Sequence, residues 1–335
     1  MDIYIKGLPD ELRNQVRDAG LFRYAYGFYI AYFLILLLGL ALGYTLLFYV
    51  DSILEAVGVG FLLALFMGQT GFLAHDITHK QVFRSERLRI IAGEFFWGLI
   101  LGLSMRFWED DHNQHHQETN KIGQDTQIND QFVFSAQQVS HLGALFRTYV
   151  LPIQHYLFFP FTALMYLALC IMSVHYVWSN LPKRRFLAEA ALMSVHYLLF
   201  VGGMVFVAGW LYTLIVQSIV IFFGGLSMGL AFAPNHKGER ILDTEEEVDY
   251  LTQIECTRNI KPSLFVDIML GGLNYQIEHH LFPKMPRPFL KRARPIVQAF
   301  CKEKGIVYHE TSLVGSYIEI LRSLKENSQT SRTEN

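Results

Sequence analysis

Three histidine clusters decide this fold: His75-Asp76-Ile77-Thr78-His79, His112-Asn113-Gln114-His115-His116 and Gln276-Ile277-Glu278-His279-His280. Residues i, i+3 and i+4 share one face of a helix, so each cluster is expected to point its side chains in one direction. A further histidine, His236, follows a long apolar run. Imidazole is a common ligand of transition metals, so eight such histidines, with Gln276 as a weaker candidate, predict a site for two metal ions.

The clusters border apolar segments that are long enough to cross a membrane. The chain has 335 residues, and 52% of them are hydrophobic. About 20 apolar residues in a helix span a hydrocarbon core of roughly 30 Å. Residues 28–50 carry no charge, and residues 53–73 lead directly into the first cluster. The shorter run 90–105 is interrupted by Glu94, so we expect it to be interfacial or re-entrant.

A basic run, Lys183-Arg184-Arg185, sets the expected topology. The positive-inside rule places it in the cytosol. Residues 187–207 would then leave the cytosol and residues 211–232 would return, with a turn at 208–210, while residues 153–178 would lie along the interface or re-enter. We therefore expect an all-α, multi-pass protein with about four transmembrane helices in two hairpins. Both termini, and a helical cap that holds the metal site, would be cytosolic.

Composition excludes several other classes of protein. A formal net charge of −2 gives no reason to expect nucleic-acid binding. The three cysteines are too few and too far apart for a disulfide framework or a cysteine zinc site. Because about 26 residues, several of them charged, precede the first apolar run, we expect a retained anchor and not a cleaved signal.

The predicted organisation has three parts. An amphipathic cytosolic segment covers residues 1–26, the membrane domain covers 27–310, and a cytosolic tail covers 311–335, disordered from Asn327. Within the membrane domain, small residues four apart predict close helix contacts. These pairs are Gly39 and Gly43, Gly98 and Gly102, and Gly225 and Gly229.

The number of candidate ligands favours iron. Zinc normally takes only three or four ligands, fewer than the candidates here. Soluble di-iron bundles use mainly carboxylate ligands, so a histidine-rich iron site would belong to a different class of di-iron protein. Nearby polar groups are expected to accept the second ring N–H of a ligand histidine. The candidates are Asp76, Glu109, Asp110, Asp111, Glu118, Asn235 and Glu278. The histidines outside the clusters are expected to pack, hydrogen-bond or lie on the surface: His141, His155, His175, His196 and His309.

The three clusters, in this order, resemble the histidine boxes of the integral-membrane fatty acid desaturases over residues 25–310. The third box reads Asn274-Tyr275-Gln276-Ile277-Glu278-His279-His280-Leu281-Phe282-Pro283. Gln276 stands where many desaturases have histidine, as in the front-end branch, and bacterial acyl-CoA and acyl-lipid desaturases share this box. The resemblance implies that a di-iron centre is held by His75, His79, His112, His115, His116, His279 and His280. It also implies that His236 is the additional ligand found in related enzymes, whereas Gln276 departs from the all-histidine pattern.

The resemblance further implies an oxygen-dependent enzyme that introduces a cis double bond into an acyl chain carried by CoA or a lipid. The chain contains no His-Pro-Gly-Gly motif of a fused cytochrome b5 domain and no dinucleotide or ferredoxin motif. We therefore expect electrons from a separate ferredoxin, cytochrome b5 or flavin/iron–sulfur reductase. The membrane would be the bacterial cytoplasmic membrane or the endoplasmic reticulum. The basic stretch 284–294 would dock that donor, a CoA phosphate or anionic lipid.

Two alternatives remain open from the sequence. A hydroxylase or ketolase of the same di-iron class would share the boxes and insert oxygen. A zinc-dependent lipid amidase or receptor, or a metal transporter, would need fewer ligands and no electron donor. Iron content and a requirement for oxygen would separate these classes.

Overall fold

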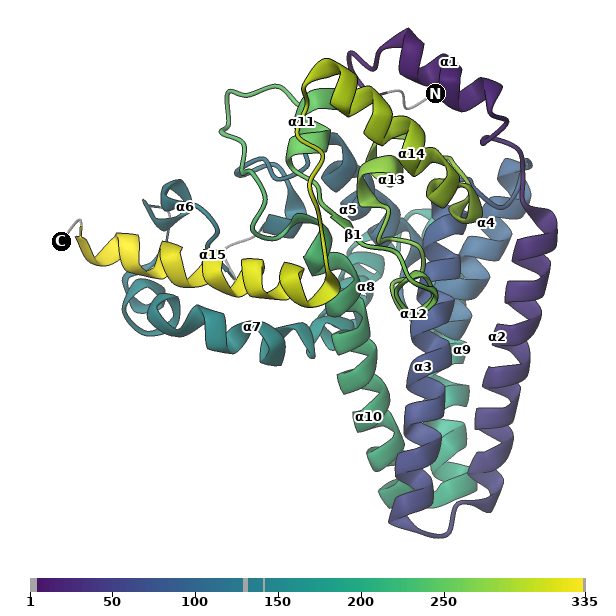
Figure 1. The fold of residues 1–335 in the computed structure, drawn as a ribbon. Helices are drawn as coiled ribbons and strands as arrows, with labels where there is room; N and C mark the ends of the chain where they lie inside the picture. Colours follow the sequence, from purple (N-terminus) through teal and green to yellow (C-terminus); the bar gives the residue numbers. More distant parts are fainter. Residues whose placement is uncertain (1–4, 129–131, 141, 334–335) are drawn as a thin grey trace. The chain divides into compact units, whose positions relative to one another are not determined.

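The described part of the chain is predominantly helical (Figure 1). The computed structural model describes residues 5–128, 132–140 and 142–333. Within these ranges the one sheet is a parallel pair of two-residue strands, β1 (Asn259–Ile260) and β2 (Glu310–Thr311). The prediction of an all-α fold is therefore confirmed.

The described residues divide into two compact units. Unit 1 holds the described residues of segments 1–23, 110–161 and 230–335, and unit 2 holds segments 24–109 and 162–229. The second and third histidine boxes and His236 belong to unit 1, whereas the first box belongs to unit 2.

Unit 2 contains the long apolar helices. Its elements are α2 (Tyr26–Leu46), η1 (Leu47–Tyr49), α3 (Ile53–Thr78), α4 (Glu86–Glu94), η2 (Phe95–Ile100), the start of α5 (Met105–Gln117), α8 (Met165–Asn180), η6 (Arg184–Phe186), α9 (Leu187–His196), η7 (Tyr197–Gly202) and most of α10 (Gly203–His236).

The first two apolar helices, α2 and α3, form a hairpin. Ser52 caps α3: its hydroxyl accepts a hydrogen bond from the Glu55 main-chain N–H, and the Glu55 carboxylate accepts one from the Ser52 N–H. The two helices meet closely at Gly39, where a Cβ atom would lie 2.2 Å from a ring carbon of Phe66. The predicted close contact at this glycine pair is confirmed.

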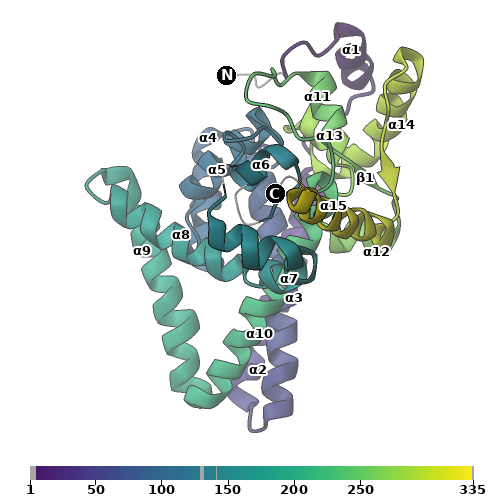
Figure 2. The same cartoon turned by 90° about the vertical axis from the view of Figure 1, so that its left-hand side faces the viewer.

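A second hairpin is formed by α9, η7 and α10 (Figure 2). Gly209 interrupts α10 with φ 79° and ψ 166°, a conformation that suits glycine because it has no Cβ. The side-chain nitrogen of Gln217 donates to the main-chain oxygen of Phe200 at 2.9 Å, across the turn. The predicted turn at 208–210 is confirmed.

The other two predicted glycine pairs also mark close approaches within unit 2. A Cβ atom on Gly98 would lie 3.1 Å from the Cβ of Leu192. A Cβ atom on Gly225 would lie 2.3 Å from the main-chain oxygen of Ala163, so only glycine fits there.

Three helices in the described ranges are long and apolar enough to cross a membrane: Tyr26–Tyr49, Ile53–Thr78 and Arg184–His236. The count rises to five if the bent pairs within 86–117 and 146–180 are each one span. These bent pairs contain the two segments for which an interfacial or re-entrant course is predicted. The predicted number of about four lies within this range.

Unit 1 contains shorter elements. They are α1 (Asp10–Asp18), the rest of α5, η3 (Thr126–Ile128), α6 (Ala136–Ser140), η4 (Phe146–Val150), η5 (Leu151–Ile153), α7 (Gln154–Thr162) as far as Phe161, the end of α10, α11 (Tyr250–Glu255), β1, α12 (Leu264–Met269), α13 (Gln276–Leu281), α14 (Arg287–Lys304), β2 and α15 (Leu313–Thr333).

The two ends of unit 1 bear on the predictions for the termini. Helix α1 is amphipathic as predicted, because Leu12 and Val16 are buried against α14 while Glu11 pairs with Lys304 at 3.1 Å. The prediction of disorder from Asn327 is wrong for the described residues, since α15 continues to Thr333. Leu324 and Ile320 of α15 are buried in an apolar cluster, which explains why this end of the chain is helical.

Candidate metal centre

The second histidine box lies on α5, where the helical spacing acts as predicted. His112, His115 and His116 are all at least nine-tenths buried, although a neutral imidazole ring carries two polar nitrogens. The Nε2 atoms of His112 and His116, one helical turn apart, are separated by 3.2 Å. A buried group of imidazoles on one face is costly unless its nitrogens are bonded.

Three histidines from three elements of unit 1 converge on one point. They are His115 of α5, His236 at the end of α10 and His280 of α13, and one ring nitrogen from each lies within 4.8 Å of the others. The Nε2 atoms of His115 and His236 are 3.3 Å apart. This group joins the second box, the third box and the isolated histidine in one compact unit.

Each of these three rings has a hydrogen-bond acceptor at its other nitrogen. Nδ1 of His115 lies 2.9 Å from a carboxylate oxygen of Asp125, and Nδ1 of His236 lies 3.2 Å from the main-chain oxygen of Cys256. Nδ1 of His280 lies 2.8 Å from the side-chain oxygen of Gln253 (α11).

These acceptors assign the Nδ1–H tautomer to all three rings. Each Nε2 atom is therefore left without a proton, and the Nε2 atoms of His115 and His236 lie 3.3 Å apart. Among the described residues, no hydrogen-bond partner lies beside Nε2 of His280. A set of convergent, unprotonated imidazole nitrogens fits a transition-metal ion.

Asp125 is held as a carboxylate in this buried setting. Burial by itself would raise its pKa, but the electrostatic attraction of His115 and Lys237 and the hydrogen bonds from His115 and the Gln127 main chain outweigh burial and hold the pKa at about 2. The Asn120 main-chain N–H also donates to Asp125, at 2.7 Å. The carboxylate is thus available to orient His115 at neutral pH.

Gln276, the residue that departs from the all-histidine pattern, adjoins the same group. Its side-chain nitrogen lies 2.9 Å from Nε2 of His236, and its side-chain oxygen accepts a hydrogen bond from Asn235 at 3.3 Å. Amide oxygen and nitrogen exchange places by a half-turn of the side chain. After such a turn the amide oxygen would face His236. An amide oxygen has lone pairs that can coordinate a metal ion.

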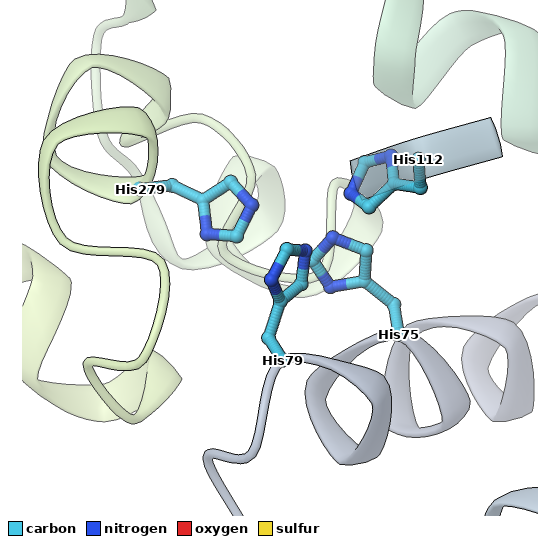
Figure 3. Close-up of side chains that lie close together, drawn as sticks. All are labelled: His75, His79, His112 and His279. Atoms are coloured by element: carbon cyan, nitrogen blue, oxygen red, sulfur yellow. The ribbon is translucent and has the colours of Figure 1, made fainter. Parts of the chain in front are cut away.

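A second grouping in unit 1 involves His112, His116 and His279. The ring centroids of His116 and His279 are 4.9 Å apart, and those of His112 and His279 are 6.5 Å apart with nearly parallel planes. Figure 3 shows the rings of His112 and His279. The third box therefore contributes His280 to one group and His279 to the other.

The third box is locked in place through Glu278, which is fully buried. Its carboxylate accepts hydrogen bonds from the side-chain nitrogen of Asn259 at 2.7 Å and the hydroxyl of Tyr308 at 2.8 Å. Asn259 also accepts from the main-chain N–H of Ile277 at 2.9 Å. Burial is the main cause that raises the pKa of Glu278 to about 7. Glu278 therefore anchors α13 to β1.

The first box lies at the end of α3 in unit 2. His75 and His79 are one helical turn apart, both buried, and their ring centroids are 4.5 Å apart (Figure 3). Nδ1 of His75 lies 3.3 Å from Asp76. Thr78, between the two histidines, accepts a hydrogen bond from the indole of Trp97 at 3.1 Å, which fixes the end of α3.

Most of the polar groups proposed from sequence to orient ligands have other partners. Glu109 pairs with Arg89 at 3.0 Å, and Asp111 bonds with Thr126. Asp110 and Glu118 line a polar groove on unit 1. Of the sequence candidates, Asp76 lies beside a boxed histidine, whereas sequence reasoning missed Asp125, Gln253 and the Cys256 carbonyl.

The isolated histidines have local roles. His196 donates from Nδ1 to the main-chain oxygen of Leu99, 2.9 Å away, and Nδ1 of His309 lies 3.0 Å from the Glu239 carboxylate. His155 stacks near Tyr156, with ring centroids 4.0 Å apart. His175 is exposed on α8, and His141 lies outside the described residues.

Comparison with known protein families agrees with the arrangement of the boxes. The family model described as fatty acid desaturase matches residues 51–312. This chain belongs to the fatty acid desaturase family. The match contains all three boxes and His236, so the resemblance seen in the motifs is confirmed. Together with its long apolar helices, family membership identifies the chain as an integral membrane protein.

Several curated members of the family are similar to this chain. The acyl-lipid (9-3)-desaturase of Physcomitrium patens is 31% identical over 275 residues, covering 79% of this chain and 52% of that protein. Fatty acid desaturase 3 of Bos taurus is 31% identical, covering 79% and 60%. The Delta(5) fatty acid desaturase fat-4 of Caenorhabditis elegans is 29% identical over 329 residues, covering 92% and 71%. The chain thus spans between about half and three quarters of the length of these relatives.

Proposed function

We propose that this protein is an oxygen-dependent fatty acyl desaturase with two iron ions. The observation that carries the proposal is the convergence of His115, His236 and His280, each with a hydrogen-bond acceptor at its Nδ1. Desaturase relatives and the order of the three boxes support it.

Unit 1 supplies the ligands of one ion from His115, His236 and His280, with Gln276 beside them. The order of the boxes makes the other boxed histidines candidate ligands of the second ion: His112, His116 and His279 of unit 1, and His75 and His79 of unit 2. This division follows from the ligand number, because nine side chains exceed what one ion takes and suit two. Eight of these nine are imidazoles, which are neutral ligands, so the bound ions keep a high positive charge.

When bound, the iron pair would supply the redox chemistry of the reaction. Dioxygen is reduced to two water molecules, and one hydrogen atom is removed from each of two neighbouring methylenes. The two further electrons come from a separate donor, and two protons complete the water formed. The residues of this chain act by position. Asp125, Gln253 and the Cys256 carbonyl hold three rings in one orientation. The buried setting of the histidines excludes bulk water from the site.

A small apolar cavity of about 20 Å³ in unit 2 is the candidate entry for the acyl chain. Its lining includes Met67 and Gly68 of α3, Trp97 of η2 and Val220 of α10. Tyr166 also lines it, and its hydroxyl donates to the main-chain oxygen of Leu101 at 2.7 Å, so no free polar group faces the cavity from this side chain. The lining is apolar, as a methylene chain requires, but the space holds only about one water molecule, so these side chains must move apart to admit an acyl chain.

The membrane arrangement is also part of this proposal. We infer four crossings in two hairpins, the active site on the cytosolic face, and reduction by a ferredoxin, a cytochrome b5 or a flavin/iron–sulfur reductase. The experiment below determines whether the acyl group is carried by CoA or by a membrane lipid. The named relatives include acyl-lipid desaturases, which favours a lipid carrier.

Expression in a host with a matching electron donor, followed by gas chromatography and mass spectrometry of total lipids and acyl-CoA, tests the proposal. We expect a new double bond that is absent with His279→Ala or His115→Ala and retained with His309→Ala, which lies outside the boxes. Hydroxylated or keto products would instead indicate the related di-iron class. Zinc without iron in the purified protein would support the hydrolase, receptor or transporter class and reject the desaturase.

A further inference from the structure

Helix α12 of unit 1 exposes an apolar surface that no part of the proposed chemistry uses. Leu264, Phe265 and Ile268 are 77%, 64% and 53% exposed. At 100° per residue these three side chains fall within an arc of about 100° on the helix. Val266 and Leu270 point the other way and are buried, so α12 has one packed face and one exposed apolar face.

The position of α12 is fixed by polar contacts on its flank. Asp267 accepts hydrogen bonds from Asn274 and from the hydroxyl of Tyr275, both at 2.9 Å, and pairs with Lys291 of α14 at 3.1 Å. Ser263 caps the helix by accepting from the main-chain N–H of Val266 at 3.1 Å. The exposed apolar face is therefore presented on a rigid helix and not on a loose loop.

Other exposed apolar side chains of unit 1 occur on elements at the same end of the unit. In both views α7, α12 and α15 lie in the lower part of unit 1, and α1, α11 and α14 lie in its upper part (Figures 1 and 2). Tyr156 of α7 is 72% exposed and Val314 of α15 is 67% exposed. Among the described residues of unit 1, the exposed large apolar side chains outside this group are Phe22, Val307 and those of segment 145–153, which leads into α7.

We propose that α12 is an interfacial membrane helix: its Leu264, Phe265 and Ile268 side chains insert into the acyl region of the phospholipid bilayer. The protein is an integral membrane protein, so a bilayer is always adjacent to it. An aromatic and two aliphatic side chains on one helical face, with Lys261 exposed just before the helix and Lys291 beside it, match an interfacial segment whose lysines reach the phosphates.

Helix α12 is linked directly to the third histidine box. Asp267 holds Asn274 and Tyr275, and the next residue, Gln276, begins α13 with its metal-ligand candidates. Bilayer contact at α12 would thus set the height of α13 above the acyl region. The proposal concerns membrane contact alone, so it stands or fails independently of the iron site and of desaturase activity.

Site-directed fluorescence in vesicles tests the proposal. The background is the full chain with Cys170→Ala, because Cys256 and Cys301 are buried and burial raises the pKa of both thiols. Phe265→Cys and Ile268→Cys are labelled with a small environment-sensitive fluorophore. Glu303→Cys is the matched control: it is exposed in the same unit, on α14, about 18 Å along the helix from Lys291.

Quenching by nitroxide-labelled phosphatidylcholine is compared with quenching by aqueous iodide. We expect the labels at 265 and 268 to be quenched several-fold more by the lipid nitroxide than the label at 303, and several-fold less by iodide. Iodide quenching at 265 and 268 equal to that at 303 would overturn the proposal. Protection from both quenchers would overturn it as well, because the face would then be covered by protein. Unchanged thermal unfolding of each labelled variant shows that the fold is intact.

Discussion

The side chain of Gln253 joins the second and third histidine boxes: its oxygen lies 2.8 Å from Nδ1 of His280, and its nitrogen donates to the main-chain oxygen of His116 at 2.7 Å. Gln253 is 1% exposed, so both hydrogen bonds are shielded from water. One amide therefore sets the tautomer of a ligand candidate and ties it to α5.

Replacing Gln253 with leucine should weaken iron binding without removing any ligand. Loss of the acceptor leaves His280 free to adopt the other tautomer and to turn, and loss of such a partner typically lowers metal affinity about 10–100-fold. Iron content of the purified variant, measured under competition with a chelator, checks this. Gln114→Leu is the control, because Gln114 is an exposed amide on the outer face of α5. Equal affinity in both variants would show that Gln253 does not orient His280.

Asp125→Asn should reduce both stability and iron binding. Asp125 accepts hydrogen bonds from His115 and from the main-chain N–H groups of Asn120 and Gln127, so an amide NH2 at this position would face a donor. An unsatisfied buried donor costs about 1–3 kcal/mol. Thermal unfolding in detergent, together with iron content, measures the two effects. A wild-type melting temperature would contradict the assignment of Asp125 as an obligatory acceptor.

Gly209→Ala should destabilise the second helical hairpin. Nothing lies within 4 Å of the added Cβ atom, so the whole effect comes from the positive φ of 79°. A residue with a side chain held in such a region costs on the order of 1–3 kcal/mol. Gly203→Ala is the matched control, because Gly203 also has open space where the Cβ atom would lie but has a helical backbone. Thermal unfolding of the two variants should differ, and an equal effect of both would contradict the assigned turn.

His309 should give the protein a weak pH dependence of stability. The hydrogen bond with Glu239 is the main cause that raises the pKa of His309 above its usual value. Stability from the charged pair is fully present below the unfolded-state pKa of about 6.5 and is lost as pH rises through the higher folded-state pKa. His309 is more than one-third exposed, so screening keeps the effect below about 1 kcal/mol.

The measurement for His309 is the melting temperature between about pH 6 and pH 9. Wild-type protein should lose stability over this range relative to His309→Gln, which carries no titrating ring. Parallel curves for the two proteins would exclude a contribution from this histidine. Desaturase activity of His309→Gln should remain, because His309 belongs to none of the boxes.

The local features of the fold could be predicted from the sequence. A helix crosses a membrane when enough successive residues are apolar, which explains why the hairpin of α2 and α3 and the turn at Gly209 were expected. The spacing of His112, His115 and His116 likewise implies one helical face. Such features depend on residues within one or two turns of each other, and sequence patterns report them directly. The helical end of the chain was missed because α15 is stabilised by packing at Leu324 and Ile320, which a polar composition does not reveal.

The partners of the ligand histidines were decided only by the tertiary structure. Asp125 is 10 residues from His115, Cys256 is 20 from His236, and Gln253 is 27 from His280. Nearer acidic groups such as Glu109 were better candidates by sequence, yet Glu109 pairs with Arg89. No periodicity links a ligand to an acceptor in another element. The sequence by itself therefore determined which imidazoles gather and on which helical faces, whereas folding chose the acceptors, because a hydrogen bond needs an atom within about 3 Å whatever its distance along the chain.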